Sequence, residues 1–173
     1  MSASGTGAAA ARERAGASPR LVAVPGPGGN GQQPAPRPAR VVVFLGVEDD
    51  VRSRVAAALL THRSKGRVRA VSASPAAIDP DPAVAGSLAE LGIDLAGCRT
   101  RPPSAELLQG AELVVVMGYD ARTPADGRRT DDWCIDDPRG KDPDAIRCIR
   151  DAIDRRVQRL LVRMGVAVPT RPG

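Results

Sequence analysis

The sequence predicts an α/β fold: a short parallel sheet of about four strands with helices on both faces, forming three layers. Two observations lead to this prediction. The runs RVVVFLG at 40–46 and ELVVVM at 112–117 are rich in β-branched residues and do not alternate with polar ones, which is typical of strands buried on both faces. Segments with apolar residues at helical spacing lie between and after these runs, and such alternation indicates parallel strands joined by helices.

The first half of the predicted domain contains two strands and two helices. After the strand at 40–46, residues 51–65 have apolar side chains at helical spacing, and Gly66 is suited to end that helix. RVRAVSAS at 67–74 is expected to form the second strand. A second helix is expected to begin at Asp81-Pro82 and to end at Gly92.

The second half contains a short helix, two strands and a long final helix. Ser104 is expected to cap a short helix at 105–110, ahead of the strand at 112–117. WCI at 133–135 is expected to be a brief strand. The segment 142–165 has an amphipathic helical pattern, whose apolar stripe is Ile146, Ile149, Ile153, Val157, Leu160 and Leu161.

The 173 residues are expected to divide into three parts. Residues 1–38 are rich in Ala, Gly, Pro, Ser and Arg, so they bury too little apolar surface to offset the entropy of ordering and are expected to be disordered. Residues 39–165 form the predicted domain, and 166–173 a short flexible C-terminus.

Charge and composition exclude several classes of protein. Residues 1–40 carry a net charge of +4 of the total of +5, so the predicted domain is nearly neutral, and aromatic residues are 2% of the chain. A basic folded face and aromatic stacking platforms are typical of nucleic-acid-binding modules, so nucleic acid is not an expected partner. No apolar run is long enough to cross a membrane, and no secretory leader is evident. Three Cys without metal-ligand spacing indicate a reduced, cytoplasmic protein.

Three stretches resemble the low-molecular-weight protein tyrosine phosphatases and the related arsenate reductases. VVVFLGVEDDVRSRVAAALL at 41–60 is similar to the family's first strand, phosphate loop and first helix. The segment 71–117 is similar to the middle of that fold. WCIDDPRGKDPDAIRCIRDAIDRRVQRLL at 133–161 is similar to the loop of the catalytic acid and the last helix.

The resemblance implies a Cys nucleophile, an Arg that grips the phosphate, and an Asp that protonates the leaving oxygen. The matching positions are Gly46 for the nucleophile, Arg52 and the following Ser53, and Asp137 for the acid. Gly46 has no side chain, so the nucleophile is absent. The matching ligand loop comprises Gly46, Val47, Glu48, Asp49, Asp50, Val51, Arg52 and Ser53.

Three carboxylates in this loop, Glu48, Asp49 and Asp50, would repel a phosphate dianion. Together with Asp136 and Asp137 they could hold a divalent cation or a cationic ligand. The favoured interpretation is that Asp49 or Asp50 caps the following helix, with Arg52 paired internally. No metal site or cofactor is predicted. An Asp nucleophile at 49 or 50 is a further, less favoured alternative.

The remaining reactive residues have structural explanations. Cys98, Cys134 and Cys148 are expected to be small buried apolar residues, although a relocated nucleophile at Cys134 stays open. His62 has no evident catalytic partner. Trp133 and Tyr119 would flank the cleft in the family arrangement or would simply pack.

Two functions are consistent with the sequence. The first is a phosphatase-like protein without catalysis, which acts by binding a protein partner or a small ligand. The alternative is an active phosphotyrosine phosphatase or arsenate reductase with altered chemistry. The sequence leaves the partner and the oligomeric state open.

Overall fold

The structure is a computed structural model that describes residues 40–46, 51–118 and 130–167. The expectations for the N-terminal segment 1–38, for the loop residues Val47, Glu48, Asp49 and Asp50, and for Tyr119 lie outside the described residues. None of the described helices has the length and apolar character needed to cross a membrane.

Five parallel strands form the sheet, in the order β3-β2-β1-β4-β5. They are β1 (Arg40–Gly46), β2 (Val68–Ala73), β3 (Thr100–Arg101), β4 (Leu113–Met117) and β5 (Thr130–Asp132). The α/β fold and the parallel sheet are confirmed, and the sheet has one strand more than the approximate number predicted. The two edge strands are short, with two residues in β3, which was not predicted, and three in β5.

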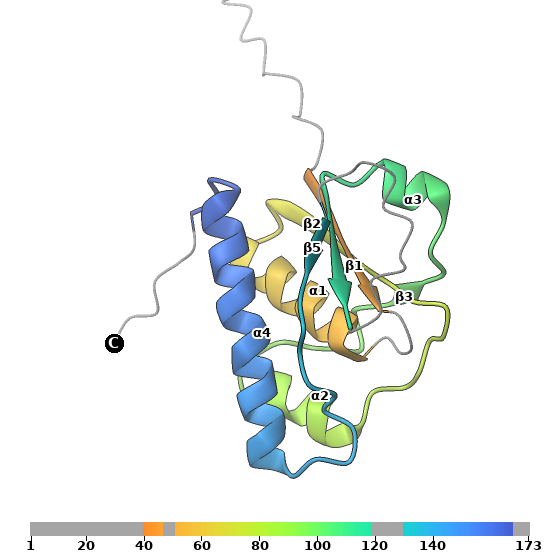
Figure 1. Cartoon of the computed structure of the whole chain (residues 1–173). Helices are drawn as coiled ribbons and strands as arrows, with labels where there is room; N and C mark the ends of the chain where they lie inside the picture. The colour runs from red at the N-terminus through yellow and green to blue at the C-terminus, as the bar shows by residue number, and fades with distance from the viewer. Residues whose placement is uncertain (1–39, 47–50, 119–129, 168–173) are drawn as a thin grey trace, which may run out of the picture. The chain divides into compact units, whose positions relative to one another are not determined.

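Helices cover both faces of the sheet (Figure 1). They are α1 (Val51–Ser64), α2 (Pro82–Ala89), α3 (Ala105–Gln109) and α4 (Pro143–Arg163). Helices α1 and α4 lie against one face, with α2 beside them, and α3 lies over the other face. This is the predicted three-layer arrangement.

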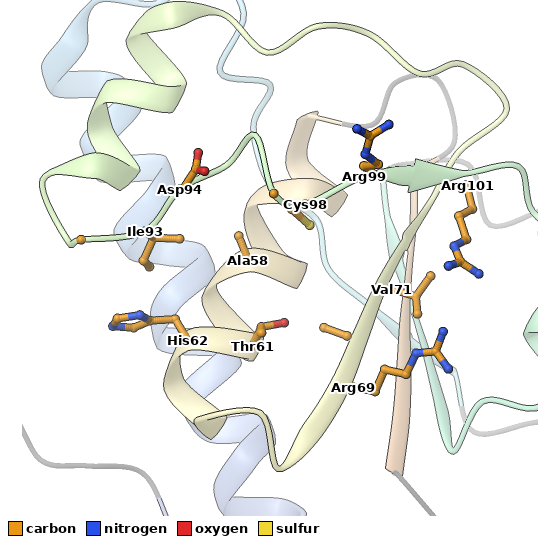
Figure 2. A pocket seen from close by; sticks show the side chains of 13 residues that line it. Ala58, Thr61, His62, Arg69, Val71, Ile93, Asp94, Cys98, Arg99 and Arg101 are labelled. Atoms are coloured by element: carbon orange, nitrogen blue, oxygen red, sulfur yellow. The ribbon is translucent and has the colours of Figure 1, made fainter.

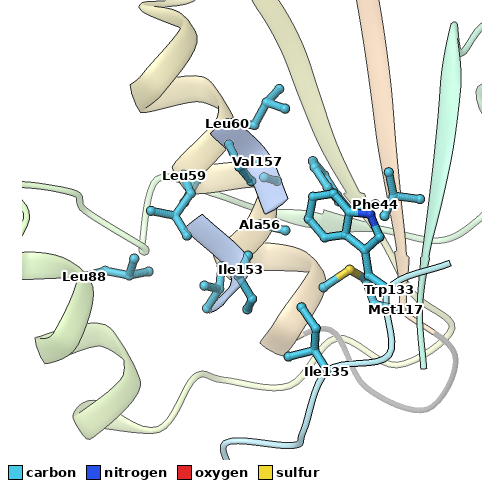
Figure 3. Packing of buried hydrophobic residues seen from close by; sticks show 14 of the residues in the cluster. Phe44, Ala56, Leu59, Leu60, Leu88, Met117, Trp133, Ile135, Ile153 and Val157 are labelled. Atoms are coloured by element: carbon cyan, nitrogen blue, oxygen red, sulfur yellow. The ribbon is translucent and has the colours of Figure 1, made fainter. Parts of the chain in front are cut away.

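The larger core cluster lies between the sheet and the α1–α4 layer (Figure 3). Phe44 of β1 packs against Trp133, with ring centroids 5.6 Å apart. The whole predicted apolar stripe of α4, from Ile146 to Leu161, is buried. A smaller cluster on the opposite face joins Val43, Leu45 and Val71 to side chains of α3. Strand β1 is therefore buried on both faces, as its sequence predicts.

The helix ends follow the predicted capping residues. The side chains of Asp81 and Ser104 accept hydrogen bonds from backbone N–H groups in the first turns of α2 and α3, at 2.8 and 3.1 Å. Asp142 does the same for α4 at 2.8 Å. Gly66 has φ +74°, a left-handed conformation that glycine adopts without the strain of a Cβ, and it follows the end of α1 as expected.

The predicted strand at 133–135 is wrong in its position, because the strand β5 precedes it. The partner strand β4 ends at Met117, and the last contact of this ladder is the N–H of Trp133 to the carbonyl of Val116, at 2.9 Å. The next two residues therefore have no neighbouring strand to pair with. Trp133, Cys134 and Ile135 alternate between buried and exposed as in a strand, but they lie beyond the paired residues of β5.

A partly buried ion pair joins α1 and α4, which lie against the same face of the sheet. Arg63 of α1 donates to both carboxylate oxygens of Asp154 of α4, at 2.9 and 2.6 Å. The two side chains are 17% and 11% exposed. Because both charges are largely withdrawn from water, each depends on the other for its stability in this position.

Replacing Asp154 by Ala should lower the free energy of unfolding by about 3 kcal/mol, because it leaves the guanidinium of Arg63 largely buried without its carboxylate. Chemical denaturation of the purified chain measures the change. The control is Asp144→Ala on the same helix, where the side chain is 92% exposed and its pair with Arg147 is screened by water. Equal losses in the two variants would contradict this explanation.

Candidate functional site

The candidate site lies at the carboxyl end of the sheet, between the end of β1 and the beginning of α1. Ligand sites of open parallel sheets form at this edge. Gly46 is the last residue of β1; it is buried and pairs with Met117 of β4. The position that matches the nucleophile is therefore part of a central strand and offers no side chain.

Arg52, in the first turn of α1, is 7% exposed. Its Nη1 donates a hydrogen bond of 2.8 Å to the backbone carbonyl of Ile135. This bond ties the beginning of α1 to the segment that follows β5. Arg52 and Asp137 are near enough for their charges to interact, so the structure brings together the two matched positions.

The next two residues of α1 bind other segments. The hydroxyl of Ser53 lies 2.9 Å from that of Ser72 in β2, which in turn lies 3.0 Å from that of Thr100 in β3. Arg54 donates from Nε to the carbonyl of Cys98 at 3.0 Å and from Nη1 to that of Ile78 at 2.9 Å. Ser53 and Arg54 are both buried.

Asp137 is held by the side chain and the backbone of Arg139. The Arg139 N–H donates to Oδ1 at 2.9 Å, and its Nε donates to Oδ2 at 2.7 Å. Partial burial raises the pKa of Asp137, but these hydrogen bonds and the charges of Arg139 and Arg52 outweigh it, so the net pKa is lowered. A general acid needs a proton to give near neutral pH. In this arrangement Asp137 is an ionised carboxylate.

The other predicted residues lie in different surroundings. Asp136 is exposed, and His62 is exposed in the last turn of α1, at the opposite end of that helix from Arg52. Trp133 is buried against Phe44 and donates to Oδ2 of Asp131 at 3.2 Å, so its role is packing. Within residues 40–46, 51–118 and 130–167, no three His, Cys, Asp or Glu side chains gather as metal ligands would.

The cysteines differ from the prediction. Cys134 and Cys148 are exposed, not buried, because each occupies an outward-facing position: Cys134 between the buried Trp133 and Ile135, and Cys148 opposite the apolar stripe of α4. Cys98 is half-buried, with its Sγ 3.6 Å from the carbonyl of Arg54. None of the three lies at the carboxyl end of β1.

Two groups at the site were not predicted. The carbonyl of Ile135 carries no sequence signal, since any residue could supply it. Arg139 could have been recognised: Asp137-Pro138-Arg139-Gly140 is a turn sequence, and an Asp in such a turn commonly accepts the backbone N–H two residues later.

Replacing Arg139 by Gln should raise the pKa of Asp137, because the charged donor is removed while partial burial, which favours the neutral acid, remains. A carboxyl-carbon NMR titration of Asp137 measures the shift directly. Lys141→Gln is the control, since it removes a charge from the same loop without a hydrogen bond to Asp137. A similar titration curve for Asp137 in wild type and Arg139→Gln would contradict the assignment.

The lowered pKa also has a consequence for stability. Asp137 stabilises the fold above the pKa of the unfolded carboxyl, and this stabilisation is lost as the pH falls through the lower, folded value. The Arg139→Gln variant should therefore lose less stability than wild type on acidification.

Comparison with solved structures identifies close matches in fold. No protein family model matches the sequence. An arsenate reductase in the phosphate binding state is 20% identical, with a TM-score of 0.64, covering 74% of this chain and 99% of that chain. A thioredoxin-dependent arsenate reductase from Corynebacterium glutamicum is 28% identical, with a TM-score of 0.62, covering 74% of this chain and 63% of that one.

A protein tyrosine phosphatase is also similar in fold. It is 19% identical, with a TM-score of 0.60, covering 74% of this chain and 97% of that chain. The chain thus has the fold of the low-molecular-weight protein tyrosine phosphatases and arsenate reductases, as its sequence resemblance implied.

Proposed function

We propose that this protein is a phosphatase-like protein without phosphatase or reductase catalysis, which acts by binding a partner or a ligand. The observation that carries the proposal is Gly46, the buried last residue of β1, at the position where the resemblance implies a Cys thiolate. Covalent phosphoryl transfer of the family's type needs a nucleophile there.

The other matched residues support the proposal because they already serve the fold. Nη1 of Arg52 is engaged by the carbonyl of Ile135, and Ser53 is part of a hydroxyl chain into the sheet. Asp137 is an ionised acceptor for Arg139. These hydrogen bonds hold neighbouring segments of the fold together whether or not a phosphate binds.

The sequence between β1 and α1 adds an electrostatic argument. Three of the four residues that link them, Glu48, Asp49 and Asp50, are acidic. Each like-charge contact with a phosphate oxygen at ~4 Å would cost about 4 kcal/mol at an effective dielectric constant near 20. A single Arg does not compensate for three such contacts.

The purified chain should release no p-nitrophenol from p-nitrophenyl phosphate and should reduce no arsenate, because no thiolate sits at the end of β1. The measurements are a chromogenic turnover assay and a thiol-coupled reductase assay. A rate that vanishes in Asp137→Asn would establish the alternative, an active enzyme with altered chemistry. A rate that vanishes in Cys134→Ser would reveal a relocated nucleophile.

Restoring the thiol alone should not restore catalysis. In Gly46→Cys the neighbouring carboxylates should oppose a phosphate dianion and raise the pKa of the new thiol, so that little thiolate forms near neutral pH. Adding Glu48→Gln, Asp49→Asn and Asp50→Asn should be required before vanadate binds. Gly46→Ser in both backgrounds is the control, since it adds a side chain of similar size without a thiol.

Vanadate titration and p-nitrophenyl phosphate turnover measure these variants, after circular dichroism shows that each is folded. Turnover by Gly46→Cys alone at about 1 per second or faster, within the ordinary range of enzymes, would contradict the electrostatic argument.

The proposed domain boundaries are residues 39–165, with 1–38 as a tail that adds little to the core. Deleting residues 1–38 should leave the melting temperature nearly unchanged, because a segment of this composition buries little apolar surface. Differential scanning calorimetry of the full and shortened chains tests this. A fall of several degrees would mean that the tail docks on the domain.

A further inference from the structure

A cavity of about 530 Å³ opens at the outer edge of β2. It lies between α1 and the segment that leads into β3, and Figure 2 shows the side chains around it. Arg69, one of its lining residues, is paired with Val41, five residues before Gly46 along β1. At about 3.3 Å per residue, the cavity is roughly 16 Å from the candidate site along the strand direction.

The backbone of β2 is uncovered at this edge. Strand β3 pairs with Ser72 and Ala73 alone, and no other described strand extends the sheet on that side. In a parallel ladder, alternate residues direct both N–H and C=O toward the same neighbour. The hydroxyl of Ser64 lies 3.4 Å from both the N and the O of Val68, while Ser72 faces β3.

Ala70 lies between these two covered positions. By the same alternation its N–H and C=O point toward the outer edge, and Ala70 is a lining residue of the cavity. Among the described backbone contacts outside helices and strands, none involves Ala70. The N–H and C=O of Ala70 therefore face the cavity as one main-chain donor and one main-chain acceptor, with the spacing of an unpaired edge strand.

The surroundings of this edge are strongly basic. Arg69, Arg99 and Arg101 line the cavity and are exposed, and none of their guanidinium groups forms a hydrogen bond or ion pair with a described residue. In Figure 2 the side chains of Arg69 and Arg101 extend toward one another beside Val71. Asp94 is the one acidic lining residue, and its Oδ1 already accepts the N–H of Ala96 at 2.9 Å.

We propose that this edge binds an acidic peptide segment in extended conformation, which adds a short strand to β2. The peptide backbone pairs with the N–H and C=O of Ala70, and its carboxylates lie beside Arg69 and Arg101. Addition of a strand to a sheet edge gives affinity through main-chain hydrogen bonds and specificity through alternate side chains.

The period of two along a strand defines the sequence that fits. Ala70 faces the α1 layer, so the peptide residue opposite it directs its side chain toward Ala58 and Thr61, where a small or apolar residue fits. Its two neighbours lie on the face of Arg69, where Asp or Glu is favoured. The recognised pattern is therefore acidic, apolar, acidic. This site is independent of any ligand at Gly46.

The test uses the full chain and a fluorescent peptide, Ser-Thr-Glu-Val-Glu-Thr-Ser, in a polarisation titration. Two matched peptides complete the set: one has Gln in place of both Glu, and one is N-methylated at the three central residues, which removes main-chain donors but keeps the charges. We expect saturable binding of the first peptide. The peptide with Gln in place of both Glu should bind with about tenfold lower affinity, which is the effect of losing one charge-assisted hydrogen bond.

Two charge variants locate the site. Arg69→Gln with Arg101→Gln should also weaken binding by about tenfold or more. Arg155→Gln with Arg159→Gln removes the same charge from exposed positions of α4 and should leave the affinity unchanged. Thermal melting of both variants checks that each remains folded.

The amide of Ala70 provides a readout in the wild-type chain. Its NMR signal should shift on titration with the peptide, and its N–H should become protected from hydrogen exchange. Absence of binding, equal binding of the Gln peptide, or equal binding of the N-methylated peptide would each overturn the proposal. The last outcome would indicate a simple anion site without strand pairing.

Discussion

The structure at the carboxyl end of the sheet depends on the hydrogen bonds made by the first turn of α1. Three consecutive polar residues, Arg52, Ser53 and Arg54, are buried there. Burial of polar and charged groups is costly unless hydrogen bonds replace those lost from water. The replacements come from separate segments: the Ile135 carbonyl, the hydroxyl of Ser72 in β2, and the carbonyls of Ile78 and Cys98. One helical turn thereby fixes the positions of β2 and three loops.

This arrangement changes how the matched residues are interpreted. If Arg52 served only to hold a phosphate, its presence beside a glycine at position 46 would have no explanation. The structure supplies one, because removal of Arg52 would leave the Ile135 carbonyl without its charged donor and a gap in the first turn of α1. Asp137 has a comparable role in ordering its own turn through Arg139. Arg52 and Asp137 therefore contribute to the structure of this chain whether or not a phosphate binds.

How far the sequence predicts the structure depends on the length of each element. The strands at 40–46 and 113–117 and the helix α4 have enough residues to show an apolar pattern, and they lie where the sequence predicts them. Strand β3 has two residues, too few for any period, so it could not be recognised. Residues 133–135 do show the alternating burial of a strand. A strand also needs a neighbouring strand to pair with, and the sequence does not show that β4 ends before this point. The matched site residues were found by resemblance, whereas the hydrogen bond to a backbone carbonyl at Ile135 depends on tertiary structure alone.

The open edge of β2 follows from the same competition between burial and pairing. Pro102 and Pro103 directly follow β3, and a residue without an N–H cannot extend the ladder beyond Arg101, at the end of β3 that lies away from Ala70. Before β3, the side chains of Ile93 and Leu95 are buried in the core beside α1 and α4. This part of the chain does not pair with Ala70 of β2. Ile93 and Leu95 are 6% and 2% exposed, so this path of the chain buries their apolar side chains, while water can bond to the N–H and C=O of Ala70. A partner strand can supply those bonds, and the charges of Arg69 and Arg101 favour an acidic one.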